Sequence, residues 1–262
     1  MILANTRLKR ILPVLGFGTW ELNGQACSEA VENAIHIGYR HIDTAQLYNN
    51  EEEVGKGIQQ SGVDRSDLFV ITKIATDNLQ PSRIISSTIN SLRKLDMDYI
   101  DLLLIHWPIP RMDLKACLEA MFELQTKEYI KYVGVSNFGP ELFLEALRFG
   151  PILNNQVKFS PYHQQSKNLE IAKAKNKTIT AYSPLGRGEV ARDQLLSIIG
   201  RKYNKTAAQI ALRWLVQLGS VSVIPKAASE KHRIENFEIF DFELSKEDMQ
   251  EIRELGKNTI VE

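Results

Sequence analysis

The sequence predicts a single domain over residues 1–262, of the α/β class with the architecture of a (β/α)8 (TIM) barrel. Eight short runs of β-branched and apolar residues recur along the chain, as buried parallel strands do. Helical patterns alternate with these runs, and no linker rich in proline, glycine or serine divides the chain. Eight such units in this length of chain are typical of a barrel.

The predicted strands lie at residues 13–19, 40–45, 67–74, 99–107, 131–138, 154–160, 178–184 and 220–226. An open, doubly wound sheet is the competing architecture. It fits less well, because no G-x-G-x-x-G motif follows a strand. The segment "GFGTWE" (16–21) has two of the three glycines, and no helix pattern opens directly after it.

The first helical pattern is predicted to start at a capping Ser28 and to stop at Gly38. The next begins with Pro81, and its apolar residues recur at helical spacing: Ile84, Ile85, Ile89, Leu92 and Leu95. Further helices are predicted over residues 114–127, 140–150, 206–219 and 245–255.

Composition excludes several classes of protein. Lys plus Arg (32) equals Asp plus Glu (32), which gives no electrostatic reason to expect nucleic acid or an anionic membrane as a partner. No apolar run approaches the roughly 20 residues that span a bilayer, and the first residues lack the pattern of a signal peptide. Cys27 and Cys117 are far apart and form no CxxC pair. We therefore expect reduced thiols in a cytoplasmic protein, and a monomer by default.

Polar residues follow the predicted strands where a barrel places its active site, at their carboxyl ends. Asp43 ends the second strand, Lys73 the third and His106 the fourth. Each has an ordinary structural interpretation: an N-cap, a lysine leaving the rim, a core histidine. Together they should surround one opening, along with the polar residues of the later strands, which are Ser136, Asn137, Gln156, Tyr182, Ser183 and Lys226.

Four of the early residues suit proton transfer. A free tyrosine has a pKa of about 10, and a nearby lysine would favour the phenolate of Tyr48 and lower its pKa. Asp43 would keep Lys73 charged, and His106 could orient a carbonyl oxygen. The set has no evident nucleophile, and the five histidines are too scattered for a metal cluster, so we expect no metal. The electron pair that forms a new bond to the carbonyl carbon must therefore come from outside the chain, and hydride from a nicotinamide fits.

The sequence resembles the aldo-keto reductase family along nearly its whole length. The resemblance rests on ordered blocks: "LGFGTW" (15–20), "GYRHIDTAQLYNNEEEVG" (38–55), "ITK" (71–73), "LLLIHWP" (102–108), "VGVSNF" (133–138), "NQVKFSPYHQ" (155–164), "AYSPLGRG" (181–188) and "IPKAASEKHRIENF" (224–237). It implies reduction of aldehydes or ketones, with Tyr48 as proton donor assisted by Asp43, Lys73 and His106.

The resemblance also implies a cofactor site. Ser136, Asn137 and Gln156 would hold the nicotinamide carboxamide, and Tyr182 would stack on the ring. Ser183, Leu185 and the turn 186–188 would lie along the pyrophosphate, Lys226 would face the ribose phosphate, and Glu235 and Asn236 the adenine. Trp20 and Trp107 would form walls of the carbonyl pocket beside Tyr48 and His106. NADP(H) is the expected cofactor, with NAD(H) possible, because Ala227 and His232 stand where relatives often carry a hydroxyl and an arginine.

Other departures concern the loops. The segments 108–112 and 186–192 are short, the chain ends at Glu262 soon after the last helix, and the first residues allow only a small hairpin. We therefore expect an open, weakly selective pocket, similar to compact prokaryotic members such as 2,5-diketogluconate and methylglyoxal reductases. Lys158 and Ser160 also depart from the family pattern, and the sequence assigns them no role. The alternatives are a non-catalytic cofactor-binding relative and, more distantly, a phosphate-binding isomerase.

Overall fold

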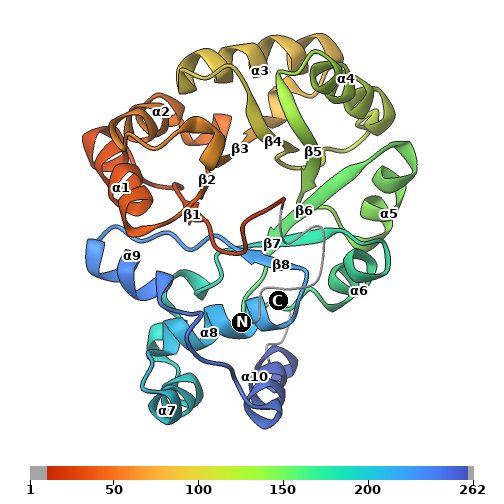
Figure 1. Cartoon of the computed structure of the whole chain (residues 1–262). Coiled ribbons are helices and arrows are strands. Elements are labelled where there is room, and N and C mark those ends of the chain that lie inside the picture. The colour runs from red at the N-terminus through yellow and green to blue at the C-terminus, as the bar shows by residue number, and fades with distance from the viewer. Residues whose placement is uncertain (1–10, 259–262) are drawn as a thin grey trace.

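The computed structural model describes residues 11–258. Its eight strands form one parallel sheet in chain order (Figure 1). They are β1 (Phe17–Gly18), β2 (His41–Asp43), β3 (Phe69–Ile74), β4 (Ile100–Ile105), β5 (Ile130–Ser136), β6 (Ile152–Lys158), β7 (Thr178–Tyr182) and β8 (Val221–Val223). The amide of Val223 donates to the carbonyl oxygen of Val14 at 2.9 Å, and that of Gly16 donates to Val223 at 2.8 Å. These bonds join the two edges, so the predicted barrel is confirmed.

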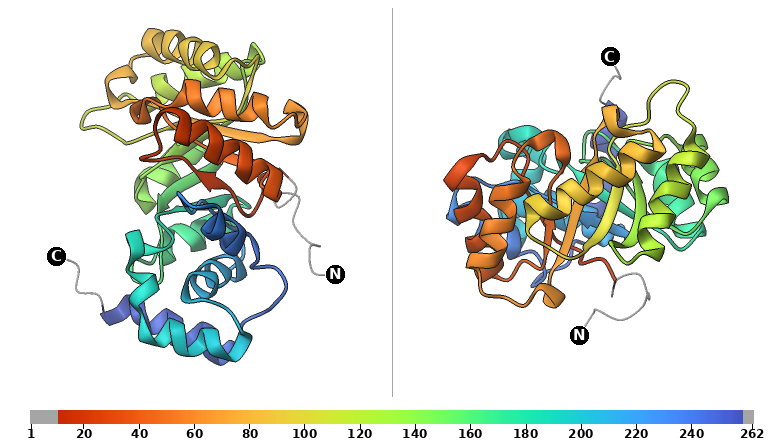
Figure 2. Two further views of the ribbon diagram at one scale, coloured as in Figure 1. Left: turned by 90° about the vertical axis from the view of Figure 1, so that its left-hand side faces the viewer. Right: turned by 90° about the horizontal axis from the view of Figure 1, so that it is seen from above.

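Helices lie outside the strands in every view (Figures 1 and 2). They are α1 (Gly24–Ile37), α2 (Glu51–Gln60), α3 (Pro81–Leu95), α4 (Leu114–Thr126), α5 (Pro140–Phe149), α6 (Ser166–Ala174), α7 (Gln194–Tyr203), α8 (Ala207–Gln217), α9 (Glu230–Phe237) and α10 (Lys246–Asn258). Side-chain caps start several of them, as at Thr206, which forms a capping box with Gln209 at the start of α8. No helix in the described part of the chain combines the length and apolar character needed to cross a bilayer.

The predicted start of the first helix is wrong. Helix α1 starts at Gly24, and Ser28 lies inside it with its hydroxyl bonded to the carbonyl oxygen of Gln25 at 2.9 Å. A serine one turn into a helix can bond back to the backbone, so it does not mark a start. On α3, Ile84, Leu92 and Leu95 are buried, whereas Ile89 is 39% exposed. The predicted stop at Gly38 is confirmed, with φ of 125°, and a Cβ there would also meet the ring of Phe237.

Alternation along the strands divides the core into two layers. In β4, Leu103 and Ile105 join the large cluster beneath the helices, whereas Leu102 and Leu104 join a small cluster with Ile71 inside the barrel. Side chains two residues apart on a strand share a face. His106 follows Leu104 by two positions and Lys73 follows Ile71 by two, so both enter the barrel interior at its carboxyl end.

The expected N-terminal hairpin and the end of the chain at Glu262 lie outside the described residues. Within them, the segment after β4 is an eight-residue connection to α4, residues 106–113, in keeping with the short loop expected there.

Candidate active site

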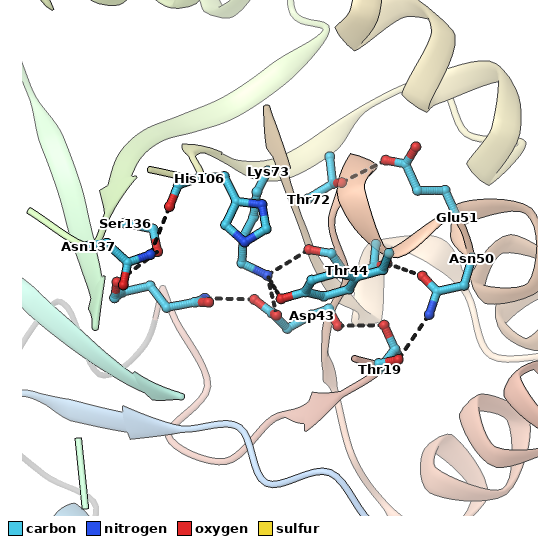
Figure 3. A network of polar contacts seen from close by, with 12 residues as sticks. Thr19, Asp43, Thr44, Asn50, Glu51, Thr72, Lys73, His106, Ser136 and Asn137 are labelled. Atoms are coloured by element: carbon cyan, nitrogen blue, oxygen red, sulfur yellow. Dashed lines mark hydrogen bonds and ion pairs between the residues drawn. The ribbon is translucent and has the colours of Figure 1, made fainter. Parts of the chain in front are cut away.

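A buried lysine at the end of β3 organises the carboxyl end of the barrel (Figure 3). The ammonium of Lys73 donates to Asp43 Oδ1 at 2.5 Å, to the carbonyl oxygen of Thr44 at 2.8 Å and to Tyr48 Oη at 3.2 Å. Lys73 and Asp43 are each only 1% exposed. Three acceptors match the three N–H donors of an ammonium, which is what makes burial of this charge tolerable.

The electrostatics of Tyr48 differ from the expectation. Its pKa is raised, because burial of the phenol outweighs the opposing effect of Lys73. The predicted lowering is therefore wrong in its net direction, although Lys73 contributes in the predicted sense. For Lys73 itself, burial disfavours the charge, but Asp43 and Tyr48 together leave the pKa raised. Near neutral pH the site thus holds a protonated phenol beside an ammonium.

His106 faces Tyr48 across the site. The two rings meet edge to face, with centroids 5.7 Å apart. Burial, reinforced by the charge of Lys73, lowers the pKa of His106 to about 3. The ring is therefore neutral near pH 7, and its buried Nδ1 has no hydrogen-bond partner among the described residues. A neutral imidazole has one N–H, so it can donate one hydrogen bond to a ligand oxygen but does not act as a cationic acid.

The residues predicted to hold a carboxamide meet beside this group. Ser136 Oγ donates to the carbonyl oxygen of Gln156 at 2.8 Å, and Asn137 Nδ2 donates to that of His106 at 2.8 Å. Tyr182 Oη donates to Asn137 Oδ1 at 2.8 Å. Gln156 Nε2 donates to Asp43 Oδ2 at 2.7 Å, which ties this set to the buried ion pair. Gln156 Oε1 accepts no hydrogen bond from the described residues and remains free for a ligand.

The segment after β8 forms a second part of the predicted cofactor site. Lys226 and His232 are exposed, and neither side chain forms an ion pair with a described residue. Arg233, in contrast, is 6% exposed and already bonded. Its guanidinium donates to the carbonyl oxygens of Ala227 and Ala228 and, at 2.7 Å, to Asn33 Oδ1 on α1. Arg233 therefore shapes the loop that carries Lys226 and does not replace an arginine at position 232.

The other predicted cofactor residues lie in the same two regions. Ser183 and Leu185 follow β7, and Ser183 adopts a positive φ of 48° at the strand end. Glu235 and Asn236 lie on α9, and Asn236 is buried.

Trp20 and Trp107 stand at the rim. Thr19 Oγ1 donates to the carbonyl oxygen of Asp43 at 2.9 Å, which holds the segment before Trp20 against β2. The side-chain amide of Asn50 donates to the carbonyl oxygens of Thr19 and Leu22, both at 2.9 Å. Trp107 follows His106 and is 46% exposed. Trp20 follows β1 and Trp107 follows β4, so both lie at the carboxyl end of the barrel, and their part in a carbonyl pocket stays a prediction.

The sequence interpretation missed a support behind the site. Glu51 is 2% exposed and accepts a hydrogen bond from Thr72 Oγ1 at 2.7 Å. Composition does not distinguish it from the adjacent Glu52 and Glu53. Helical spacing does, because Glu51 shares a face with Val54 and Ile58, both buried.

Lys158 and Ser160, the two residues that depart from the family pattern, lie at the end of β6 and just after it. Lys158 is exposed at the end of β6, and Ser160 is buried in a turn, where its hydroxyl accepts from the amide of His163 at 3.2 Å. No group of three or more potential metal ligands occurs in the described chain.

Comparison with known proteins agrees with this geometry. Residues 14–257 match the family model described as "Aldo/keto reductase family". The chain belongs to the aldo-keto reductase family. It is 40% identical to the glyoxal reductase of Bacillus subtilis, with 94% of this chain and 90% of that protein covered. It is also 40% identical to the 9,11-endoperoxide prostaglandin H2 reductase of Trypanosoma cruzi, with 94% and 89% covered.

Solved structures show the same architecture. A putative 2,5-diketo-D-gluconic acid reductase B superimposes with a TM-score of 0.93 at 42% identity, covering 95% of this chain and 90% of that one. This aldo-keto reductase is thus an oxidoreductase for carbonyl groups, of a family that uses nicotinamide cofactors. The non-catalytic alternative gains no support.

Proposed function

We propose that the protein reduces small aldehydes and dicarbonyls with NAD(P)H, and that Tyr48 supplies the proton. One observation carries the assignment: the ammonium of Lys73 contacts Asp43 and Tyr48 at the same time in a buried site. A bound reduced nicotinamide would supply hydride to the carbonyl carbon.

The balance of charge favours Tyr48 as the acid. Its raised pKa keeps the phenol protonated and ready to donate. As the proton leaves, the phenolate forms 3.2 Å from the ammonium of Lys73, where water is largely excluded. The attraction is therefore stronger in the transition state than in the ground state, which is the requirement for catalysis. Asp43 holds Lys73 in place and compensates its charge.

His106 and the carboxamide set position the reactants. The single N–H of neutral His106 would hold the carbonyl oxygen within reach of Tyr48. The free Oε1 of Gln156 fits the amide group of a nicotinamide, and Ser136 and Asn137 lie beside it. Because Gln156 also bonds to Asp43, the same side chain would fix the cofactor ring relative to the proton donor.

For the cofactor, the proposal is NADP(H) with weak discrimination against NAD(H). Lys226 is exposed and unpaired among the described residues, so its ammonium is available to a phosphate. No second permanent charge helps it, because Arg233 is bonded to the loop backbone and His232 is a histidine. A single flexible ammonium discriminates less than a bidentate arginine does.

The names of the relatives support the substrate class. Glyoxal reductase of B. subtilis and methylglyoxal reductase DkgA of Escherichia coli act, by name, on small dicarbonyls. The short connection after β4 leaves few side chains to enclose a substrate, in keeping with broad selectivity. The proposal includes a cytoplasmic location, since both cysteines are buried free thiols of the kind that a reducing compartment preserves. It also includes a monomer, as the default for a compact barrel.

Replacement of Tyr48 by phenylalanine tests the central assignment. Tyr48→Phe removes the hydroxyl and keeps the ring, so turnover of methylglyoxal should fall about 10²–10⁴-fold while cofactor binding is retained. Loss of absorbance of the reduced nicotinamide measures turnover, and quenching of tryptophan fluorescence measures binding. Near-normal turnover in the variant would show that another group is the acid.

A further inference from the structure

The turn after β7 holds an arginine in an unusual backbone conformation. Arg187 has φ of 54°, and its neighbours Gly186 and Gly188 have φ of 58° and 98°. Glycine adopts this region freely, but a residue with a Cβ does so rarely. A side chain kept in such a position, between two glycines, suggests a role for the side chain itself.

The guanidinium of Arg187 lies across the rim from its own strand. Its central carbon is 4.6 Å from the centre of the Trp20 ring, so it bridges the turn after β7 and the loop after β1. Burial raises the pKa of Tyr182, and the charges of Arg187 and Lys73 oppose that rise, while the Tyr48 phenol also acts on it. Arg187 is therefore within electrostatic reach of the group that surrounds the proposed proton donor.

No residue in the described part of the chain compensates the charge of Arg187. Among residues 11–258 its guanidinium forms no hydrogen bond and no ion pair, and its side chain is exposed. Glu189 belongs to the same segment but packs against Gly186, and Glu21 follows Trp20. Neither carboxylate forms an ion pair with Arg187. Stacking on an indole fixes the plane of a guanidinium and leaves its N–H groups free at the edge.

We propose that Arg187 makes the enzyme select carbonyl substrates that carry a carboxylate. With the guanidinium over the Trp20 ring, its free donors can bind the two oxygens of a carboxylate bidentately. The carbonyl group of the same molecule would lie at Tyr48 and His106. This inference rests on the proposed function, because it concerns the substrate of that same site.

A matched pair of substrates tests the inference. The acid is 4-carboxybenzaldehyde, and its neutral counterpart is methyl 4-formylbenzoate. In Arg187→Gln, the ratio of kcat/KM for the acid to that for the ester should fall about tenfold, through KM for the acid. This is the low end for a charge-assisted bond, as suits an exposed side chain. Arg187→Lys, which keeps the charge but not the fork, should recover part of the ratio.

Arg192→Gln is the matched control, because it removes an equally exposed arginine from the same segment and should leave the ratio unchanged. Added salt should lower kcat/KM for the acid more than for the ester in the native enzyme, and this difference should shrink in Arg187→Gln.

The outcomes separate the hypotheses. Equal losses on acid and ester would overturn the inference and indicate a structural role. A raised KM for NADPH with an unchanged ratio would also overturn it, and would assign the guanidinium to the cofactor diphosphate. If the native enzyme reduced neither aldehyde, nor methylglyoxal, the proposed function would fail. If it reduced both aldehydes with the same ratio as Arg187→Gln, only the role of Arg187 would fail.

Discussion

Replacement of Asp43 by asparagine should unfold the barrel more easily, besides stopping catalysis. In the native protein, Asp43 Oδ1 accepts from Lys73 at 2.5 Å and Oδ2 accepts from Gln156 at 2.7 Å. Asparagine keeps the shape but removes the charge. The ammonium of Lys73, 1% exposed, would then have only neutral partners.

The size of the effect follows from that burial. Breaking a buried pair by removing one charge costs about 3–5 kcal/mol, because the other charge stays desolvated. For a domain of this size, each kcal/mol shifts Tm by about 2–4 °C, so Asp43→Asn should melt about 10 °C lower. The variant's Lys73 should have a depressed pKa, so the loss should be fully present near neutral pH and shrink as pH rises toward the pKa of a free lysine.

A double-mutant cycle in urea isolates the pair. Asp43→Asn, Lys73→Met and the double variant are compared with the native protein by circular dichroism. The double variant should be more stable than either single variant, because no buried charge remains unpaired. Additive losses, or a loss below about 1 kcal/mol in Asp43→Asn, would show that the two side chains are not a buried pair whose charges compensate each other.

Three further predictions concern titration and cofactor choice. With saturating cofactor, kcat/KM for a neutral aldehyde should be flat from about pH 5 to pH 9. The reason is that His106 has a pKa of about 3 and that the pKa of Tyr48 is raised. An inflection near pH 6.5 would show that His106 titrates. Burial raises the pKa of Glu51, so its ionisation costs the folded protein stability as pH rises. In urea titrations, Glu51→Gln should therefore gain stability relative to the native protein between pH 5 and pH 8. A stability difference between the two proteins that does not change with pH would contradict this. Finally, kcat/KM should favour NADPH over NADH only modestly, because Lys226 offers the phosphate a single flexible ammonium. Equal use of both cofactors would show that Lys226 does not engage the phosphate, and a preference of several thousandfold would reveal another phosphate ligand.

The sequence predicted the barrel because its strands and helices follow from periodicity, and the strand ends predicted which polar side chains lie together. All eight strands occur where apolar runs predicted them, and strand ends brought Asp43, Lys73 and His106 together as expected. What it could not predict depends on burial and on contacts between distant segments. The phenol of Tyr48 responds more to desolvation than to the lysine beside it, and spacing along the chain does not reveal that balance.

Arg233 and Glu51 show the same limit on single residues. The sequence does not show whether Arg233 is available for a phosphate, and only its hydrogen bonds to Asn33 on α1 and to the backbone of residues 227–228 show that it binds its own loop. Glu51 is one of three consecutive glutamates, although its helical face could have identified it as buried. A buried charged residue is therefore identified by the helical face that it shares with buried apolar residues, and not by its residue type.

The hydrogen bond between Gln156 and Asp43 joins residues 113 positions apart in the chain. Under the proposed assignment, every residue that handles the proton lies at or before His106, and every residue that holds the cofactor lies at or after Ser136. The residues for the two chemical tasks therefore follow one another along the chain. Those that supply the proton come first, and those that hold the nicotinamide come second. During synthesis the first portion would carry a phenol and an ammonium with no hydride source to act with. Reduction of a carbonyl would become possible only when the later strands pack against the earlier ones, so the enzyme would become active only when the barrel is complete.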